Sequence, residues 1–223
     1  MLQTSTLKFL KDLAKNNNKE WFDANRKRYE TARQDYIELA DKIIKGFCKK
    51  DKDFETLEAK KCLFRINRDV RFSKDKSPYK TNFGASFERG GRISPFAAYY
   101  LHIEPGNKSF IAGGVWQPEP ERMKKIRQEI DYNWSDFKKI ISNKKFVSLF
   151  KDLEKTKETS LSREPKGYEK DNPAIDYIKL KSWVVSAPLK DTELTDKDLL
   201  KKVLQAFETM QPMIIFLNNA IDE

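Results

Sequence analysis

The sequence predicts an α+β fold in which a central antiparallel sheet is flanked by helices from both ends of the chain. Before residue 50 and after residue 118, apolar residues recur every three or four positions, which is typical of helices with one buried side. Between about residues 62 and 116 they alternate or form short runs separated by turn-forming residues, which favours an antiparallel meander. No repeat or composition change marks a boundary, so residues 1–223 are predicted to form a single domain.

Two helices are predicted near the N-terminus. The first covers residues 4–14, where leucines recur on one side. Asn17 is followed three residues later by Glu20, as in a capping box, which predicts the start of a second helix. That helix is expected to run to about residue 47.

The meander is expected to contain four strand segments. Alternation or short apolar runs place them at 62–72, 83–87, 97–103 and 110–116. The turn signals between them are Ser77-Pro78, Gly90-Gly91 and Pro105-Gly106-Asn107.

The C-terminal half is predicted to return to helices. Helical spacing occurs at 119–131, 134–142 and 144–154, a polar loop at 155–172, a short helix at 173–180 and a short strand at 183–187. A last helix begins after Thr195. Pro212 lies inside it and is expected to kink or split it, because proline removes a backbone hydrogen bond.

The chain is basic, and the excess charge is concentrated in one region. The net charge is +10, and residues 60 to 92 contain ten Lys or Arg against three acids, a local net charge of +7. Such an excess favours anionic partners. The predicted helices contain both acidic and basic residues, as is typical of solvent-exposed helix faces.

Composition excludes several classes of site. Cys48 and Cys62 are too few for a disulfide framework and are expected to be reduced and buried. With a single histidine, His102, the usual zinc ligand sets cannot form, and no metal site is predicted. No segment has a signal-peptide pattern or approaches the ~18 apolar residues of a membrane span. We therefore expect a cytoplasmic protein without a membrane partner.

One basic run matches a longer pattern with fixed spacing. Its fixed positions are Arg65, Arg68, Asp69, Arg71, Phe72, Asp75, Lys76 and Tyr79. This pattern resembles the signature of a family of bacterial proteins of similar length, domain-of-unknown-function family 2461. Further similar segments lie at 9–22, 99–105, 113–116 and 165–168, so the resemblance extends over most of the chain. It implies no catalytic role, since the family is catalogued without a function.

The arginines of this run are expected to lie on two faces. In a strand over 62–72, Arg65, Asp69 and Arg71 share one face, and Arg68 interrupts the apolar face. Arg68 would need a partner there, because an unpaired buried charge costs several kcal/mol. Asp69 is expected to hold one arginine in a bidentate pair.

Two interpretations of the run remain open. In the first, it binds a small anionic ligand with phosphate or carboxylate groups. The candidate ligand-binding residues are Arg65, Arg68, Arg71, Lys76, Tyr79 and Lys80. In the second, the arginines pair with nearby acids and only tie the meander together. The local excess of +7 favours the ligand, because the nearby acids are too few to neutralise the bases.

Catalytic and alternative roles are weaker hypotheses. His102 shares a predicted strand face with Tyr100 and Glu104 and is a candidate general acid or base. Asp69 is a second catalytic candidate, although its arginine neighbours should lower its pKa. The rival functions are nucleic-acid binding on a basic sheet face and a protein-interaction module with a structural Arg/Asp network. No glycine-rich phosphate loop, dinucleotide fingerprint or serine elbow is present in the sequence. The sequence leaves both the cofactor and the oligomeric state undetermined.

Overall fold

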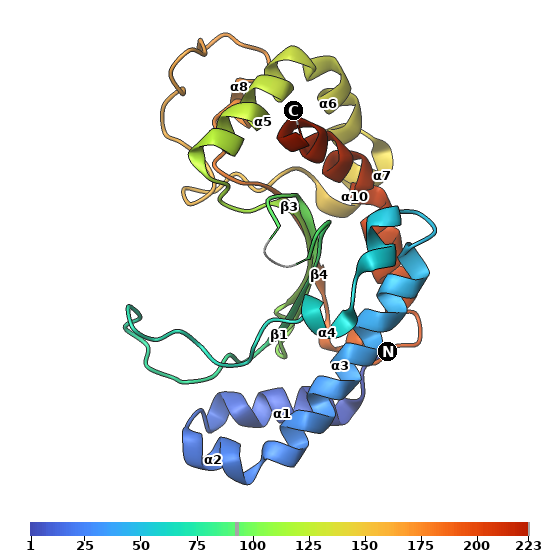
Figure 1. Cartoon of the computed structure of the whole chain (residues 1–223). Helices are drawn as coiled ribbons and strands as arrows, with labels where there is room; N and C mark the ends of the chain where they lie inside the picture. Colours follow the sequence, from blue (N-terminus) through green and yellow to red (C-terminus); the bar gives the residue numbers. More distant parts are fainter. Residues whose placement is uncertain (92–93, 223) are drawn as a thin grey trace. The chain divides into compact units, whose positions relative to one another are not determined.

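The computed structural model describes residues 1–91 and 94–222, which fold into two compact units (Figure 1). Unit 1 comprises Met1–Arg92, Tyr100–Ile111 and Pro188–Leu204, and unit 2 comprises Ile93–Tyr99, Ala112–Ala187 and Gln205–Glu223. Arg92, which contributes to the local charge excess, lies outside the described residues. The predicted α+β class is confirmed, and the expectation of one domain stays a prediction.

The sheet is an antiparallel meander. Its strands follow one another in space as they do in sequence, in the order β1-β2-β3-β4. Their bounds are β1 Phe83–Phe87, β2 Ala98–Ile103, β3 Ser109–Val115 and β4 Trp183–Leu189. Residues 62–72, predicted as the first strand, precede the sheet without forming a regular strand.

Unit 1 contains the N-terminal helices and one short helix, α9, from later in the chain. They are α1 (Thr4–Lys15), α2 (Lys19–Ala24), α3 (Arg26–Phe47), the 3-10 helix η1 (Lys52–Thr56) and the short α4 (Ala59–Cys62) and α9 (Asp191–Leu194). The predicted second helix is therefore interrupted at Asn25, which ends α2 and precedes α3. Asn18, rather than Asn17, caps α2 by accepting a hydrogen bond from the Trp21 backbone.

Helix α3 packs its apolar side on the sheet within unit 1. Tyr36 is fully buried, its ring stacks on Phe83 at 5.6 Å, and its hydroxyl donates to the Leu101 carbonyl at 2.7 Å. Alternate residues of β2 point to this side, so Leu101 and Ile103 are buried. Tyr100 and His102 alternate with them and lie on the opposite, half-exposed face.

Unit 2 contains the remaining helices. They are α5 (Pro120–Tyr132), α6 (Trp134–Ile141), α7 (Lys144–Phe150), α8 (Ile175–Ile178) and the C-terminal part of α10 (Leu199–Asp222). Helix α7 ends earlier than predicted, because Lys151 adopts a positive φ of 66°. Helix α10 continues past Pro212 and is not split there. None of the described helices combines the length and apolar character needed to cross a membrane.

Candidate functional site

The basic run forms an arm, residues 64–82, that extends from the start of β1 (Figure 1). Near its base the two sides pair, through a bridge between Asn67 and Tyr79 and a hydrogen bond from the Lys80 amide to the Ile66 carbonyl. Closer to the sheet, Phe64 donates to the Gly84 carbonyl.

A register shift explains why the arm is not a regular strand. Two backbone hydrogen bonds join the sides, one between Phe64 and Gly84 and one between Ile66 and Lys80. Between these two bonds the first side spans two residue positions, whereas the second side spans four. The two additional residues bend the second side and interrupt the ladder. The predicted strand over 62–72 is therefore replaced by isolated bridges.

The arm is held at its base by Asn17 and Phe22. The Asn17 amide donates to the Tyr79 carbonyl at 2.9 Å and accepts from the Tyr79 backbone N–H at 3.1 Å. The Phe22 ring stacks on the Tyr79 ring with centroids 3.9 Å apart. Tyr79 is buried, and burial raises the pKa of its hydroxyl. Its ring belongs to the packing of the arm, so we leave it out of the proposed ligand contacts.

Both carboxylates of the arm are paired with arginines. Arg71 donates to Asp69 through Nε at 3.0 Å and Nη2 at 2.7 Å, which confirms the predicted bidentate pair. Arg68 is paired with Asp75 and also donates to the Ser77 carbonyl at 3.2 Å. Arg68 is half-buried, and Asp75 is the partner that its charge was expected to need.

These pairs keep the two carboxylates ionised. The Asp69 pKa is lowered, mainly by the hydrogen bond from Arg71. Hydrogen bonds from Ser77, followed by the one from Arg68, lower the Asp75 pKa to about 2. A carboxylate with a lowered pKa is a weak base, so we do not propose Asp69 as a catalytic base.

Among the described residues, Arg65, Lys74 and Lys76 form no ion pair with these acids. Arg65 and Lys74 are exposed and make no hydrogen bond or ion pair with another residue that the structure describes. Lys76 donates to the Val70 carbonyl at 3.0 Å, and the Lys80 ammonium lies 5.3 Å from the centroid of the Phe64 ring. Residues 65, 69 and 71 are exposed, but they do not share the face of a strand, because residues 62–72 form no regular strand.

A second group of polar residues lies on the half-exposed face of β2. Tyr100, His102 and the following Glu104 form a row, here called the Tyr–His–Glu chain. The Tyr100 hydroxyl lies 3.2 Å from His102 Nδ1, and His102 Nε2 lies 3.1 Å from Glu104 Oε2. The predicted shared face is confirmed. The His102 side chain is only 13% exposed and stacks on the Phe110 ring at 4.6 Å.

The carboxylate at the end of the chain is itself fixed. Lys108 lies 3.5 Å from Glu104 Oε1, and the Thr81 hydroxyl donates to the same oxygen at 3.4 Å. The Glu104 backbone is tied to the Ser109 hydroxyl. These contacts orient the carboxylate toward the histidine ring.

Gly84 leaves room for the Tyr100 hydroxyl. A Cβ atom at this position would overlap the hydroxyl oxygen and lie 3.1 Å from Tyr100 Cζ. Burial raises the pKa of Tyr100 to about 12. The sequence placed Tyr100 beside His102 but did not predict the contact between Tyr100 and Gly84, because this contact joins two strands whose register was unknown.

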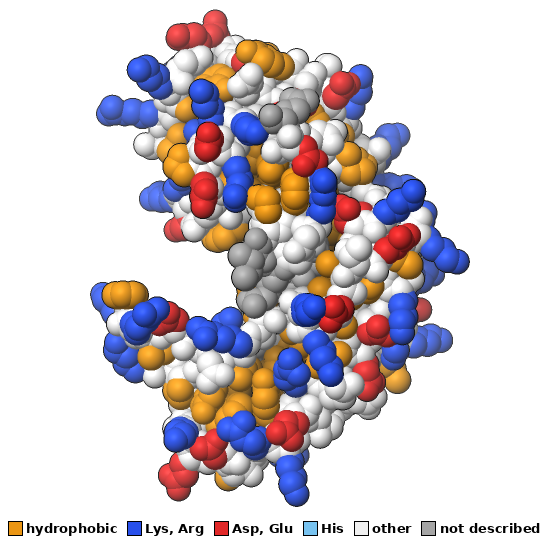
Figure 2. Space-filling view, in the orientation of Figure 1, with side chains coloured by type: hydrophobic (Ala, Val, Ile, Leu, Met, Phe, Trp, Pro, Cys, Tyr) orange, Lys and Arg blue, Asp and Glu red, His pale blue; other side chains and the backbone are white. Residues whose placement is uncertain are grey.

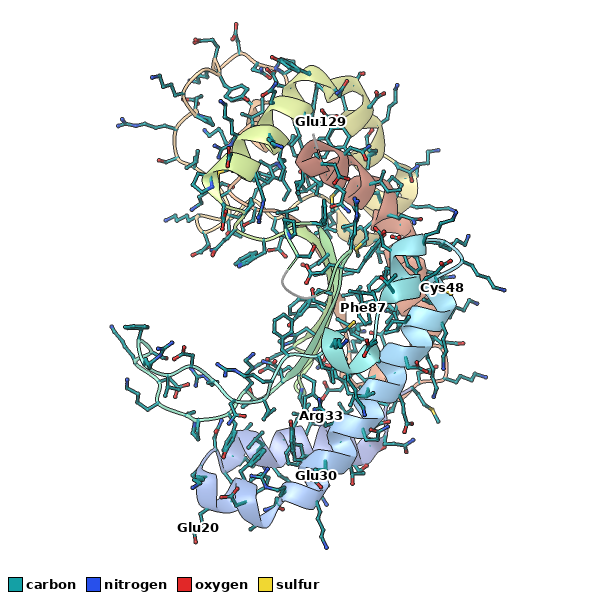
Figure 3. All side chains as sticks on the ribbon, in the orientation of Figure 1. Glu20, Glu30, Arg33, Cys48, Phe87 and Glu129 are labelled. Atoms are coloured by element: carbon teal, nitrogen blue, oxygen red, sulfur yellow. The ribbon has the colours of Figure 1, made fainter. Side chains whose placement is uncertain are left out.

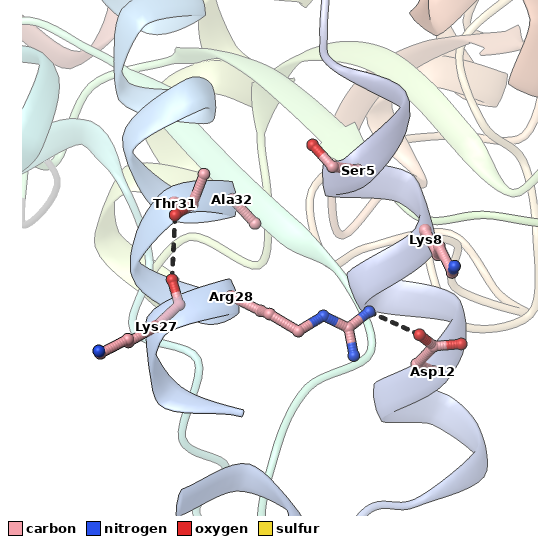
Figure 4. Close-up of a pocket in the computed structure, with 7 residues that line it drawn as sticks. All are labelled: Ser5, Lys8, Asp12, Lys27, Arg28, Thr31 and Ala32. Atoms are coloured by element: carbon pink, nitrogen blue, oxygen red, sulfur yellow. Dashed lines mark hydrogen bonds and ion pairs between the residues drawn. The ribbon is translucent and has the colours of Figure 1, made fainter. Parts of the chain in front are cut away.

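A hollow between α1 and α3 lies apart from both groups (Figure 4). Its volume is ≈ 410 Å³, and its lining residues are Ser5, Lys8, Asp12, Lys27, Arg28, Thr31 and Ala32. Arg28 is already paired with Asp12 at 2.6 Å. Since this leaves no buried unpaired polar group in the lining, we do not build a site there.

Neither cysteine belongs to these groups. Cys62 is buried, and burial raises the pKa of its thiol to about 11. Cys48 lies just after α3 and is half-buried, which corrects the expectation that both thiols are buried (Figure 3). Across residues 1–91 and 94–222, no three His, Cys, Asp or Glu side chains gather where a metal ion could be held.

Together, these features define an α+β protein with a basic arm beside the first strand of an antiparallel sheet. Residues 5–216 match the family described as conserved hypothetical protein (DUF2461), so the chain belongs to this family, as its motif predicted. No curated protein and no solved structure matches the chain.

Proposed function

We propose that the protein binds a small anionic ligand bearing phosphate or carboxylate groups, and that the arm is its binding site. One observation carries the proposal. Both acids of the arm are bound to Arg68 and Arg71 and, among the described residues, form no ion pair with Arg65, Lys74 or Lys76, so the arm keeps an excess of positive charge. An anion from solution would supply the missing charge.

The arginines offer suitable donors. Arginine has five N–H donors in a planar fork, and the pair between Arg71 and Asp69 leaves the Nη1 group of Arg71 available. Asp69 therefore orients a guanidinium that still has donors for a ligand. Arg65, exposed and not paired, provides a second fork for bidentate contact with phosphate or carboxylate.

The spacing of the cations favours a ligand with more than one negative group. Arg71 follows Arg65 by six positions, and an extended chain advances about 3.3 Å per residue, so their Cα atoms are at most about 20 Å apart. A ligand with several phosphates can reach several cations, whereas a single phosphate contacts one part of the arm. Polyphosphates are thus the first probe.

The test is a calorimetric titration with inorganic tripolyphosphate. A hydrogen bond to a charged group contributes about 1.5–3 kcal/mol, so Arg65→Gln should weaken binding roughly tenfold to a hundredfold. Arg163→Gln is the matched control, since Arg163 is exposed and makes no ion pair with another described residue. Equal affinities of the two variants would contradict the proposal.

A second candidate, single-stranded nucleic acid, is favoured by Phe72. This side chain is 94% exposed, and the Arg71 guanidinium lies 5.7 Å from its ring centroid. Hydrophobic and cationic side chains both appear at the end of the arm (Figure 2). An exposed ring beside cations can stack on a base while the cations contact phosphates.

Fluorescence anisotropy with a labelled oligothymidine tests this candidate. Stacking contributes about 1–3 kcal/mol per base, so Phe72→Ala should weaken binding about five- to 150-fold, and added salt should weaken it further. Tyr132→Ala removes another exposed ring, 73% accessible, and should leave binding unchanged. Absence of binding at low salt would exclude this candidate and leave the small ligand.

A further inference from the structure

We propose that Tyr100 is a nucleophilic hydroxyl whose proton is accepted by His102, with Glu104 as the residue that positions the histidine. The proposal rests on the geometry of the Tyr–His–Glu chain and does not depend on a ligand at the arm. The donor–acceptor distances of 3.2 and 3.1 Å link the three side chains in one row.

The chemistry of the groups fixes the direction of the chain. A carboxylate has no proton to donate, so Glu104 accepts and His102 Nε2 carries the proton between them. In the neutral imidazole, Nδ1 then has a free lone pair, and among the described residues the group that donates to it is the Tyr100 hydroxyl. This is the arrangement of a nucleophile, a base and an orienting carboxylate.

The reaction step balances without another reagent. As Tyr100 Oη forms a bond to an electrophilic atom, its proton moves to His102 Nδ1. The bond to the leaving group breaks, and the leaving group departs with the electron pair. The resulting imidazolium faces Glu104, whose negative charge stabilises it. Such help is needed because Tyr100, with its raised pKa, holds its proton at neutral pH.

The surroundings indicate the class of substrate. The Tyr100 ring lies between the Phe64 and Phe110 rings, with centroids 6.0 and 5.9 Å away. The Lys80 ammonium lies over the Phe64 ring. An apolar wall beside a cation suits an anionic molecule with a flat apolar part that carries an acyl or phosphoryl group for transfer.

An arylsulfonyl fluoride is the probe for the test, because it forms a Tyr–O–S bond and releases fluoride without needing the natural substrate. Peptide mass spectrometry should show Tyr100 modified at least tenfold faster than Tyr132, although Tyr132 is far more exposed. His102→Gln should slow modification of Tyr100 roughly tenfold to a hundredfold, at the lower end of general-base effects. Arg163→Gln, a change outside both the arm and the Tyr–His–Glu chain, should leave the rate unchanged.

The single histidine provides a second readout that a merely structural chain would not reproduce. With nitrogen-15 histidine, the wild-type spectrum should show the Nε2-protonated form, and Glu104→Gln should lose that preference and slow the labelling of Tyr100. Faster modification of Tyr132 than of Tyr100 would overturn the proposal. So would an unchanged Tyr100 rate in a folded Glu104→Gln protein whose histidine spectrum has changed. The second measurement keeps the test decisive even if His102→Gln does not fold.

Discussion

Replacing Asn17 by alanine should loosen the arm at its base. The Asn17 side chain makes two hydrogen bonds to the Tyr79 backbone, at 2.9 and 3.1 Å, between residues 62 apart in sequence. At about 0.5–1.5 kcal/mol each, their loss costs about 1–3 kcal/mol. The stacking of Phe22 on Tyr79 remains in the variant and should limit the change to the arm.

Amide hydrogen exchange measured by NMR provides the assay. The Tyr79 N–H donates to Asn17, so Asn17→Ala should raise its exchange rate about five- to 150-fold. Asn16→Ala is the matched control, because among the described residues the Asn16 side chain bonds only to the Asp12 carbonyl four residues away. If Tyr79 exchanges at the same rate in both variants, the side chain of Asn17 does not hold the arm and the reasoning is refuted.

Three further outcomes are expected. Gly84→Ala should destabilise the protein by about 1–3 kcal/mol in urea unfolding, because the new methyl group overlaps the Tyr100 hydroxyl; an unchanged midpoint would contradict this. A thiol-specific disulfide reagent at pH 8 should react at least tenfold faster with Cys48 than with Cys62, because Cys62 is buried and its thiol pKa is about 11. After denaturation the two cysteines should react at equal rates. Because the pKa of Asp75 is lowered in the folded arm, its stabilising pairing is complete above the ordinary value near 3.9 and should be lost as the pH falls through about 2. Carbon-13 carboxyl shifts measure this titration, and a midpoint near 4 would show that the pairing does not form.

Local patterns predicted much of the fold and part of the site. The helical spacing predicted α1, α5 and α6 to within one or two residues, because each has a clear apolar side and a nearby stop signal. The arginines clustered around Asp69 predicted that this carboxylate would form a bidentate pair. These features depend on residues close together in sequence.

What the sequence did not predict depends on distant partners. Asn17 and Asn18 are equivalent as helix caps by residue type, but in the structure Asn17 bonds to the distant Tyr79 and Asn18 caps α2. The strand expected over 62–72 depends on a register that the two additional residues before Gly84 interrupt. Neither feature has a local signal, since each is decided by chain segments that meet only after folding.

The base of the arm also protects the sheet from self-association. Strand β1 is at the end of the strand order, and Leu63 and Phe64 cover part of its outer edge through a bridge to Ala85 and a hydrogen bond to Gly84. An uncovered edge strand presents unpaired amides and carbonyls to which another molecule can add a strand. A change that detaches Leu63 and Phe64 from β1 would therefore expose an unpaired strand edge. Such a variant would aggregate, and its loss from solution would have to be separated from any loss of ligand binding.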